Sequence, residues 1–131
     1  MKKIIAAALV ASLCLSSLSA AKKQKSKKVK IGIAKIVQHV ALDDVERGVM
    51  DAIKAAGFDA SFDRQNANGD VNTANQIANQ FKDEGVNVAV GIATPVAIAL
   101  ANTMKDTPVV FGTVTDPLGA GLVSTLDHGE R

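Results

Sequence analysis

Strand-like and helix-like patterns of hydrophobic residues alternate along the chain from residue 30 onward. Continuous runs of β-branched and apolar residues predict buried strands at Lys30–Val37, Phe58–Phe62, Val86–Ile92 and Pro108–Val114. Between these runs, apolar residues recur at helical spacing, and short connections contain Gly, Pro or Asn. This order predicts an α/β fold, a Rossmann-like lobe of three layers in which helices cover both faces of a parallel sheet.

Residues at the ends of the first two predicted helices support these boundaries. The first helix stops at Gly57, and the second begins behind the N-cap residue Asp70 and stops at Gly85. Three acidic residues place negative charge in the first turn of the first helix, namely Asp43, Asp44 and Glu46. The third helix, which starts near residue 94, is apolar almost all round and must therefore be mostly buried.

The start of the third predicted helix is a candidate anion site. We expect Thr94 to be the N-cap and Pro95 to occupy the first helical position, which leaves the N–H groups of Val96 and Ala97 without partners. A carboxylate could bind to these groups at the positive end of the helix. The alternative is that Thr94 only caps its own helix.

Polar residues gather where the predicted strands end. In an open parallel sheet, ligands bind outside the carboxyl ends of the strands, which here fall at 37–41, 64–70, 92–95 and 112–117. Thr113, Thr115 and Asp116 follow the fourth strand, where Asp116 could pair with an ammonium group or simply open an Asp-Pro turn. His39 and Gln38 lie in the first loop, where a lone His often fixes the loop by a hydrogen bond. Residues 66–70 have the composition of a tight turn.

Composition and missing motifs exclude several functions. Without Trp or Tyr and with four Phe, the chain offers no platform for stacking nucleic-acid bases, and one Cys and two His are too few for a metal centre. No phosphate-binding glycine motif, no nucleophile with its base and no pair of carboxylates at helical spacing near a strand end is evident. We therefore expect neither an enzyme nor a cofactor.

The first thirty residues have the character of an export signal and a leader. Residues 1–21 combine two lysines, an apolar run and a small-residue end, which predicts a signal peptide cleaved after Ala21. Leu13 before Cys14 argues against lipid attachment at that cysteine. Eight of the 15 Lys and Arg residues precede residue 31, whereas all 13 acidic residues follow it. Residues 22–30 are thus expected to form a basic flexible leader to an acidic lobe at 31–131 in the periplasm or outside the cell.

Six strings in order resemble the N-terminal part of the ABC transporter substrate-binding proteins of the tryptophan/tyrosine-binding type. They span about residues 29 to 126 and read VQHVALD from Val37, NANGD from Asn66, ANQIA from Ala74, ATP from Ala93, PVVF from Pro108 and VTDPLGAGLV from Val114. The resemblance implies the first lobe of a type I periplasmic binding protein, which closes on a small solute and delivers it to membrane permease subunits.

The resemblance also implies which residues touch the ligand, an amino acid or a similar zwitterion. These ligand-binding candidates are Gln38, His39, Thr94, Pro95, Val96, Thr113, Thr115 and Asp116. The chain departs from the family at Val40, where proline is usual. It also reads His128-Gly129-Glu130-Arg131 where the family continues into a second lobe, so we expect a truncated single lobe that binds ligand weakly.

Two further functions remain open from the sequence. The first is an extracytoplasmic sensory or interaction module of the same fold that associates with itself as a dimer of lobes. The second is a transcription regulator, which would need a helix-turn-helix that the sequence lacks and a location that the predicted signal peptide contradicts.

Overall fold

The computed structural model describes residues 27–128, so the predicted signal peptide and most of the predicted leader lie outside the described residues. Strands and helices alternate along the described chain: β1 (Val29–Lys35), α1 (Val40–Ala55), β2 (Ala60–Asn66), α2 (Val71–Asp83), β3 (Val88–Ile92), α3 (Thr94–Thr103) and β4 (Val109–Gly112). The four strands form one parallel sheet in the order β2-β1-β3-β4.

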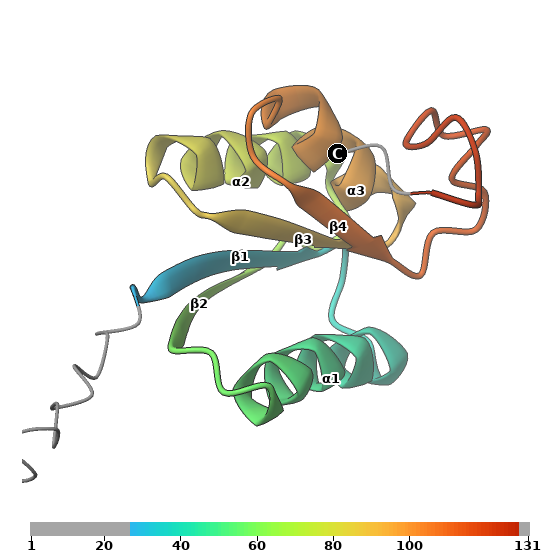
Figure 1. Cartoon of the computed structure of the whole chain (residues 1–131). Helices are drawn as coiled ribbons and strands as arrows, with labels where there is room; N and C mark the ends of the chain where they lie inside the picture. Colours follow the sequence, from blue (N-terminus) through green and yellow to red (C-terminus); the bar gives the residue numbers. More distant parts are fainter. Residues whose placement is uncertain (1–26, 129–131) are drawn as a thin grey trace, which may run out of the picture.

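The helices lie on both faces of this sheet, as Figure 1 shows, with α1 on one side and α2 and α3 side by side on the other. The predicted α/β fold with a Rossmann-like, three-layer arrangement is therefore confirmed. The chain leaves β1 toward β2 on one side and then crosses back to β3 on the other side. The sheet consequently has a topological switch point between β1 and β3, where ligands bind in doubly wound folds.

A separate apolar cluster fills each face of the sheet. On the α1 face, Ile31 and Ile33 of β1 and Val90 and Ile92 of β3 pack against the apolar stripe of α1. On the opposite face, α2 and α3 cover the small residues of the strands, and Phe81 of α2 is completely buried there. The predicted burial of α3 is confirmed.

The predicted helix ends agree with the structure for α1 and α2, except that α1 begins at Val40, so that of the three acidic residues predicted for its first turn only Asp43 lies there. Asp70 is the N-cap of α2, and its carboxylate accepts hydrogen bonds from the N–H groups of Asn72 and Thr73 at 3.0 and 3.2 Å. Gly57 and Gly85 follow α1 and α2 with φ of +80° and +63°, a conformation that glycine adopts without strain.

The strand boundaries differ from the prediction, most of all for β2. We predicted Phe58–Phe62, but the strand runs over Ala60–Asn66, and Phe58 is exposed directly after the end of α1. The physical reason is that β2 lies at the edge of the sheet, where polar side chains alternate with apolar ones and no continuous apolar run develops. The strands β1, β3 and β4 are shorter than predicted by one, two and three residues.

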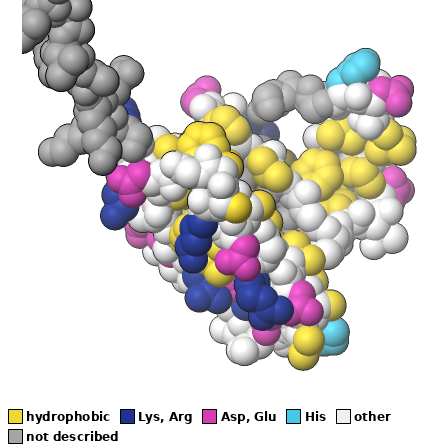
Figure 2. All heavy atoms as spheres, turned by 60° about the horizontal axis from the view of Figure 1, so that its bottom comes forward, with side chains coloured by type: hydrophobic (Ala, Val, Ile, Leu, Met, Phe, Trp, Pro, Cys, Tyr) yellow, Lys and Arg dark blue, Asp and Glu magenta, His cyan; other side chains and the backbone are white. Residues whose placement is uncertain are grey.

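Many acidic and basic side chains lie on the face of the molecule around α1 (Figure 2). Figure 2 turns this side toward the viewer and shows acidic and basic side chains close together over it, among them the ion pair between Asp44 and Arg47. Within residues 27–128, no helix combines the length and apolarity that crossing a membrane requires.

Gly91 of β3 lets α3 approach the sheet closely. A Cβ atom at this position would lie 2.9 Å from the Cα of Ala97 and 3.1 Å from its backbone nitrogen. We therefore expect Gly91→Ala to lower the free energy of unfolding by about 2 kcal/mol, because the backbone of α3 must move. Chemical denaturation measures this difference. Gly48→Ala is the control, since open space surrounds Gly48 in α1, and it should leave stability unchanged or raise it slightly.

Candidate functional site

The four strands end in the same row of the sheet. Lys35 of β1 is paired with Asn66 of β2 and with Ile92 of β3, and Ile92 is paired with Gly112 of β4. The loops that follow these residues therefore leave the sheet side by side at one edge. We call this edge, with residues 36–39, 67–70, 93–96 and 113–117, the carboxyl rim. The predicted ligand-binding residues all lie in the rim and are distributed over three of its four loops.

Main-chain hydrogen bonds join the neighbouring loops of the carboxyl rim. Four of them connect successive strands across the rim: Ala67 N to Lys35 O at 2.9 Å, Gly69 N to Ile36 O at 2.6 Å, Ile36 N to Ile92 O at 3.3 Å and Ala93 N to Gly112 O at 3.0 Å. These bonds satisfy backbone groups of neighbouring loops and hold the loops together at the rim.

The first loop of the carboxyl rim begins α1. His39 is the N-cap residue of this helix, and its Nδ1 accepts a hydrogen bond from the N–H of Ala41 at 3.2 Å. The carbonyl of His39 accepts a second hydrogen bond from the N–H of Asp43 at 2.9 Å. His39 thus fixes this loop, while its side chain and that of Gln38 remain exposed at the rim.

The start of α3 differs from the prediction. The N-cap residue is Ala93, and Thr94 is already helical and makes no capping hydrogen bond. The N–H of Ala97, which we expected to be free, donates to the carbonyl of Ala93 at 3.1 Å. The reason is that a single residue separates β3 from α3, so the helix begins one residue earlier than the Thr-Pro pair suggested.

Two donors and a strained residue remain at this helix start. Among the described residues, the N–H groups of Thr94 and Val96 have no hydrogen-bond partner; Thr94 is half-buried, whereas Val96 is completely buried and lies out of reach of a solute at the rim. Ala93 adopts φ 84° and ψ 154°, a region that is almost restricted to glycine. Backbone strain of this kind, of about 1 to 3 kcal/mol, collects at functional sites, where the surrounding structure holds the residue in place.

The loop after β4 contains a compact turn. The Oδ1 atom of Asp116 accepts a hydrogen bond from the N–H of Gly119 at 2.9 Å, which gives Asp116 the turn role that the sequence left open. Thr113 has φ 54° and its hydroxyl donates to the carbonyl of Gly112 at 2.7 Å. The side chains of Thr113, Thr115 and Asp116 are all exposed.

The loop after β2 is the tight turn that its composition predicts. The side-chain oxygen of Asn66 accepts a hydrogen bond from the N–H of Asn68 at 2.9 Å. Asn68 and Gly69 then take φ of 52° and 82° before Asp70 caps α2. This loop shapes the rim by its backbone.

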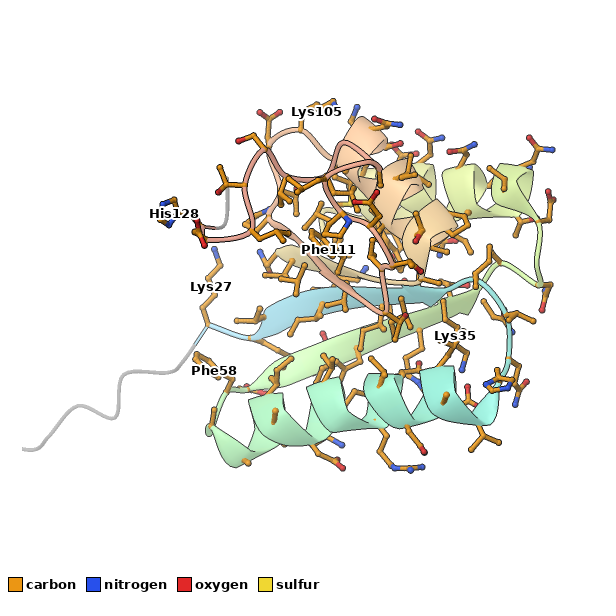
Figure 3. The ribbon with its side chains drawn as sticks, turned by 90° about the vertical axis from the view of Figure 1, so that its right-hand side faces the viewer. Lys27, Lys35, Phe58, Lys105, Phe111 and His128 are labelled. Atoms are coloured by element: carbon orange, nitrogen blue, oxygen red, sulfur yellow. The ribbon has the colours of Figure 1, made fainter. Side chains whose placement is uncertain are left out.

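A charged cluster under the carboxyl rim escaped the sequence analysis. The Nζ atom of Lys35, at the end of β1, lies 2.5 Å from Oδ1 of Asp43 and 2.8 Å from Oε2 of Glu46 (Figure 3). The other carboxylate oxygen of Glu46 lies 2.6 Å from Nε of Arg64 in β2. Glu46 is almost completely buried, with 2% of its surface exposed.

This cluster corrects one of our expectations. Asp43 and Glu46 are a pair of carboxylates at helical spacing near a strand end, which we had judged to be absent. Their partners lie 8 to 18 residues away along the chain, so local periodicity gives no sign of the cluster. The usable signal is Lys35 itself, because a lysine inside an apolar strand needs an acidic partner.

The cluster perturbs the ionisation of its members. The hydrogen bonds that the Lys35 ammonium donates to Asp43 and Glu46 raise the pKa of Lys35. The hydrogen bond with Arg64, together with that of Lys35, lowers the pKa of Glu46 although burial opposes this change. Lys35, Glu46 and Arg64 therefore stay charged near neutral pH, and the cluster has the character of a structural ion network.

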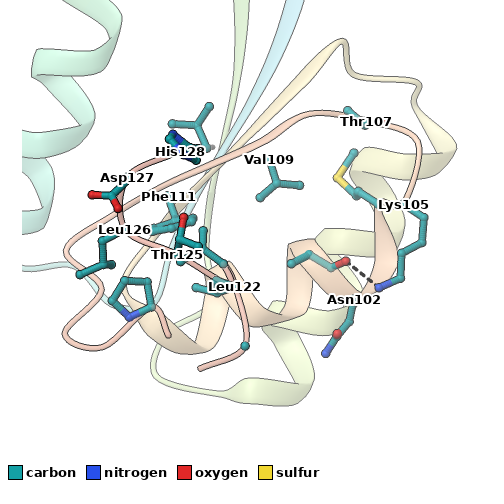
Figure 4. Close-up of a pocket in the computed structure, with 16 residues that line it drawn as sticks. Asn102, Lys105, Thr107, Val109, Phe111, Leu122, Thr125, Leu126, Asp127 and His128 are labelled. Carbon is teal, nitrogen blue, oxygen red and sulfur yellow. Dashed lines mark hydrogen bonds between the residues drawn. The ribbon is translucent and has the colours of Figure 1, made fainter. Parts of the chain in front are cut away.

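A pocket of about 610 Å3 lies beside the carboxyl rim and shares only Pro117 with it. It is enclosed by the end of α3, by β4 and by residues 117–128, and Figure 4 shows apolar side chains such as Val109, Phe111 and Leu122 on its walls. None of the predicted ligand-binding residues lines this pocket. Within residues 27–128, no group of three or more His, Cys, Asp or Glu side chains is placed to hold a metal ion.

Comparison with known proteins identifies the family. The profile of the ABC transporter substrate-binding proteins matches residues 30–130, which includes every strand and helix of the fold except the first residue of β1. The chain belongs to this family. The resemblance recognised in the sequence is therefore confirmed.

Several members of the substrate-binding protein family resemble the chain along its folded part. The chain is 34% identical over 111 residues to the tyrosine-binding protein of Clostridioides difficile. This match covers 81% of the chain and 32% of the relative. A conserved domain protein of Vibrio cholerae shares 45% identity with a TM-score of 0.74. A Streptococcus pneumonia ABC domain solved in complex with L-Trp shares 36% identity with a TM-score of 0.73.

Both solved structures are much longer than the similar region. The matches cover 76% of this chain and 35% of each solved chain. The chain thus spans about one third of the length of the substrate-binding proteins that it matches.

Proposed function

We propose that the carboxyl rim binds a small zwitterion, such as an aromatic amino acid, and that the chain serves an ABC importer outside the cytoplasm. The observation that carries this proposal is the start of α3, where the N–H group of the half-buried Thr94 has no acceptor among residues 27–128. Free N–H groups at a helix start attract a carboxylate, and the helix dipole contributes about 0.3 to 2 kcal/mol.

The remaining loops supply groups for the other end of such a ligand. Asp116 provides a carboxylate for an ammonium group, and Thr115 provides an exposed hydroxyl in the same loop. Gln38 and His39 border the rim from the β1 side. The ligand class is supported by the L-Trp complex of one relative and by the name of the tyrosine-binding protein. The partners of the importer would be its membrane permease subunits.

L-Trp is expected to bind the chain with a Kd of about 1 mM, which corresponds to roughly 4 kcal/mol. The rim contacts a ligand from one side, whereas full pockets enclose about 70 to 90% of it. Nuclear magnetic resonance titration of the labelled chain measures the affinity and locates the ligand. The amide signals of Thr94 and Thr115 should shift.

Ligand analogues and a matched pair of variants test the assignment of groups. Tryptamine lacks the carboxylate and should not shift the Thr94 signal. Asp116→Asn preserves an acceptor for the Gly119 N–H but removes the charge, and it should weaken L-Trp binding about threefold, as expected for an exposed ion pair. Asp106→Asn, in the loop after α3, is the control. Shifts confined to the pocket beside β4 would contradict the proposal.

A further inference from the structure

One ion pair joins the two residues that flank the first loop of the carboxyl rim, at the end of β1 and in the first turn of α1. Lys35 is the last residue of β1, and Asp43 lies in the first turn of α1, with 2.5 Å between Nζ and Oδ1. The loop residues 36–39 lie between them in the sequence. The backbone N–H of Asp43 also donates to the carbonyl of His39 at 2.9 Å. Asp43 therefore holds the strand through its side chain and the loop through its backbone.

A second ion pair, with Glu46, holds the Lys35 ammonium group in place. Its Nζ atom donates to Oε2 of Glu46 at 2.8 Å, and Glu46 is itself held by Arg64 of β2. The ammonium group thus has partners in two successive turns of α1, and its side chain is 11% exposed. These contacts fix both the height and the rotation of α1 relative to the strand ends, because a buried lysine has few other positions in which its charge is satisfied.

We propose that Lys35 and Asp43 are positioning residues for the carboxyl rim, and that their ion pair holds the His39 cap and Gln38 in place for the ligand. The consequence for ligand binding rests on the proposed function, whereas the consequence for the loop does not. Gln38 and His39 are exposed, and within the described residues the hydrogen bonds that the His39 side chain and carbonyl accept both come from α1. The order of the His39 end of the loop therefore depends on where α1 begins, whereas backbone hydrogen bonds of Ile36 hold the other end.

Asp43 separates this role from a general contribution to folding. Its side chain is 31% exposed, whereas that of Glu46 is 3% exposed. Replacing Asp43 by asparagine leaves the buried contacts of Lys35 and Arg64 with Glu46 intact. The neighbouring Asp44 pairs with Arg47 on the surface and not with Lys35. Asp43→Asn and Asp44→Asn thus remove the same charge one residue apart, and only the first variant loosens the ion pair with Lys35.

The experiment compares both variants with the unmodified chain by nuclear magnetic resonance. For Asp43→Asn we expect the hydrogen exchange of the Ala41 amide to accelerate about fivefold, as a helix cap worth about 1 kcal/mol is weakened. The nitrogen signal of the His39 Nδ1 atom should shift as its hydrogen bond with Ala41 loosens. Asp43→Glu keeps the carboxylate and should restore both signals, which a role in folding stability alone would not require.

A ligand titration completes the test. L-Trp should bind Asp43→Asn about threefold more weakly than Asp44→Asn, because a less ordered loop must be fixed during binding. Equal exchange rates of Ala41 and equal His39 signals in the two variants would overturn the positioning role. If those signals change but no variant binds L-Trp, the positioning of the loop stands and the proposed function fails.

Discussion

Phe81→Ala is expected to lower the free energy of unfolding by about 4 kcal/mol, the largest effect of any single substitution considered for this fold. The Phe81 ring is completely buried between α2 and the sheet, and it is the largest fully buried side chain in the described part of the chain. Its removal leaves a cavity that small neighbours such as Ala34 and Ala78 cannot fill. Urea denaturation followed by circular dichroism measures the change.

Gly32 of β1 provides a specific check on this contact. A Cβ atom at Gly32 would lie 2.6 Å from the Phe81 ring, so Gly32→Ala alone should cost about 1 to 3 kcal/mol through crowding. In the Phe81→Leu background the same substitution should cost much less, because the ring edge is gone. Additive effects of the two substitutions would show that the ring does not lie against Gly32.

Glu46→Gln is expected to lower the free energy of unfolding by about 3 kcal/mol at pH 7. The substitution leaves Lys35, which is 9% exposed, with Asp43 as its remaining charged partner. Breaking a buried ion pair by removing one member costs roughly 3 to 5 kcal/mol, and the exposed guanidinium of Arg64 reduces this cost. Glu84→Gln is the matched control, because Glu84 pairs with Lys30 at the surface and should change stability much less.

The pH dependence of the free energy of unfolding of Glu46→Gln tests whether the loss of stability is electrostatic. Because the pKa of Glu46 is lowered in the folded chain, its contribution to stability is present above the ordinary value of 4.5 and disappears as the pH falls through the folded pKa. The raised pKa of Lys35 has the opposite sign, so its contribution disappears only as the pH rises above 10.5. The stability difference between the original chain and Glu46→Gln should therefore shrink toward acid pH. A constant difference from pH 7 to pH 3 would rule out this electrostatic origin.

Local signals in the sequence predicted the elements that local interactions determine. The second helix illustrates this, because Asp70, the apolar stripe ending at Phe81 and Gly85 each act within a few residues of their own position. The strand β2 was misplaced because its edge position, which exposes polar side chains, depends on strand order. No local pattern contains that information.

In the candidate site, too, features set by local interactions were predicted and features set by distant residues were not. The alternation of strands and helices was enough to place the predicted ligand-binding loops at one edge of the sheet. The start of α3 was off by one residue, since the conformation of Ala93 depends on its hydrogen bond to Gly112 of another strand. The cluster around Lys35 joins three elements and could not be read from spacing along one of them.

The backbone of Ala93 has a consequence for how a solute would be recognised. A glycine would adopt this conformation without strain, yet the chain carries a residue that resists it by about 1 to 3 kcal/mol. The methyl group narrows the range of alternative conformations at the turn, so the N–H group of Thr94 beyond it is preorganised before any solute arrives. Less entropy is then lost on association. The strain at Ala93 lowers the stability of the fold, but it leaves the ligand-binding turn rigid before binding.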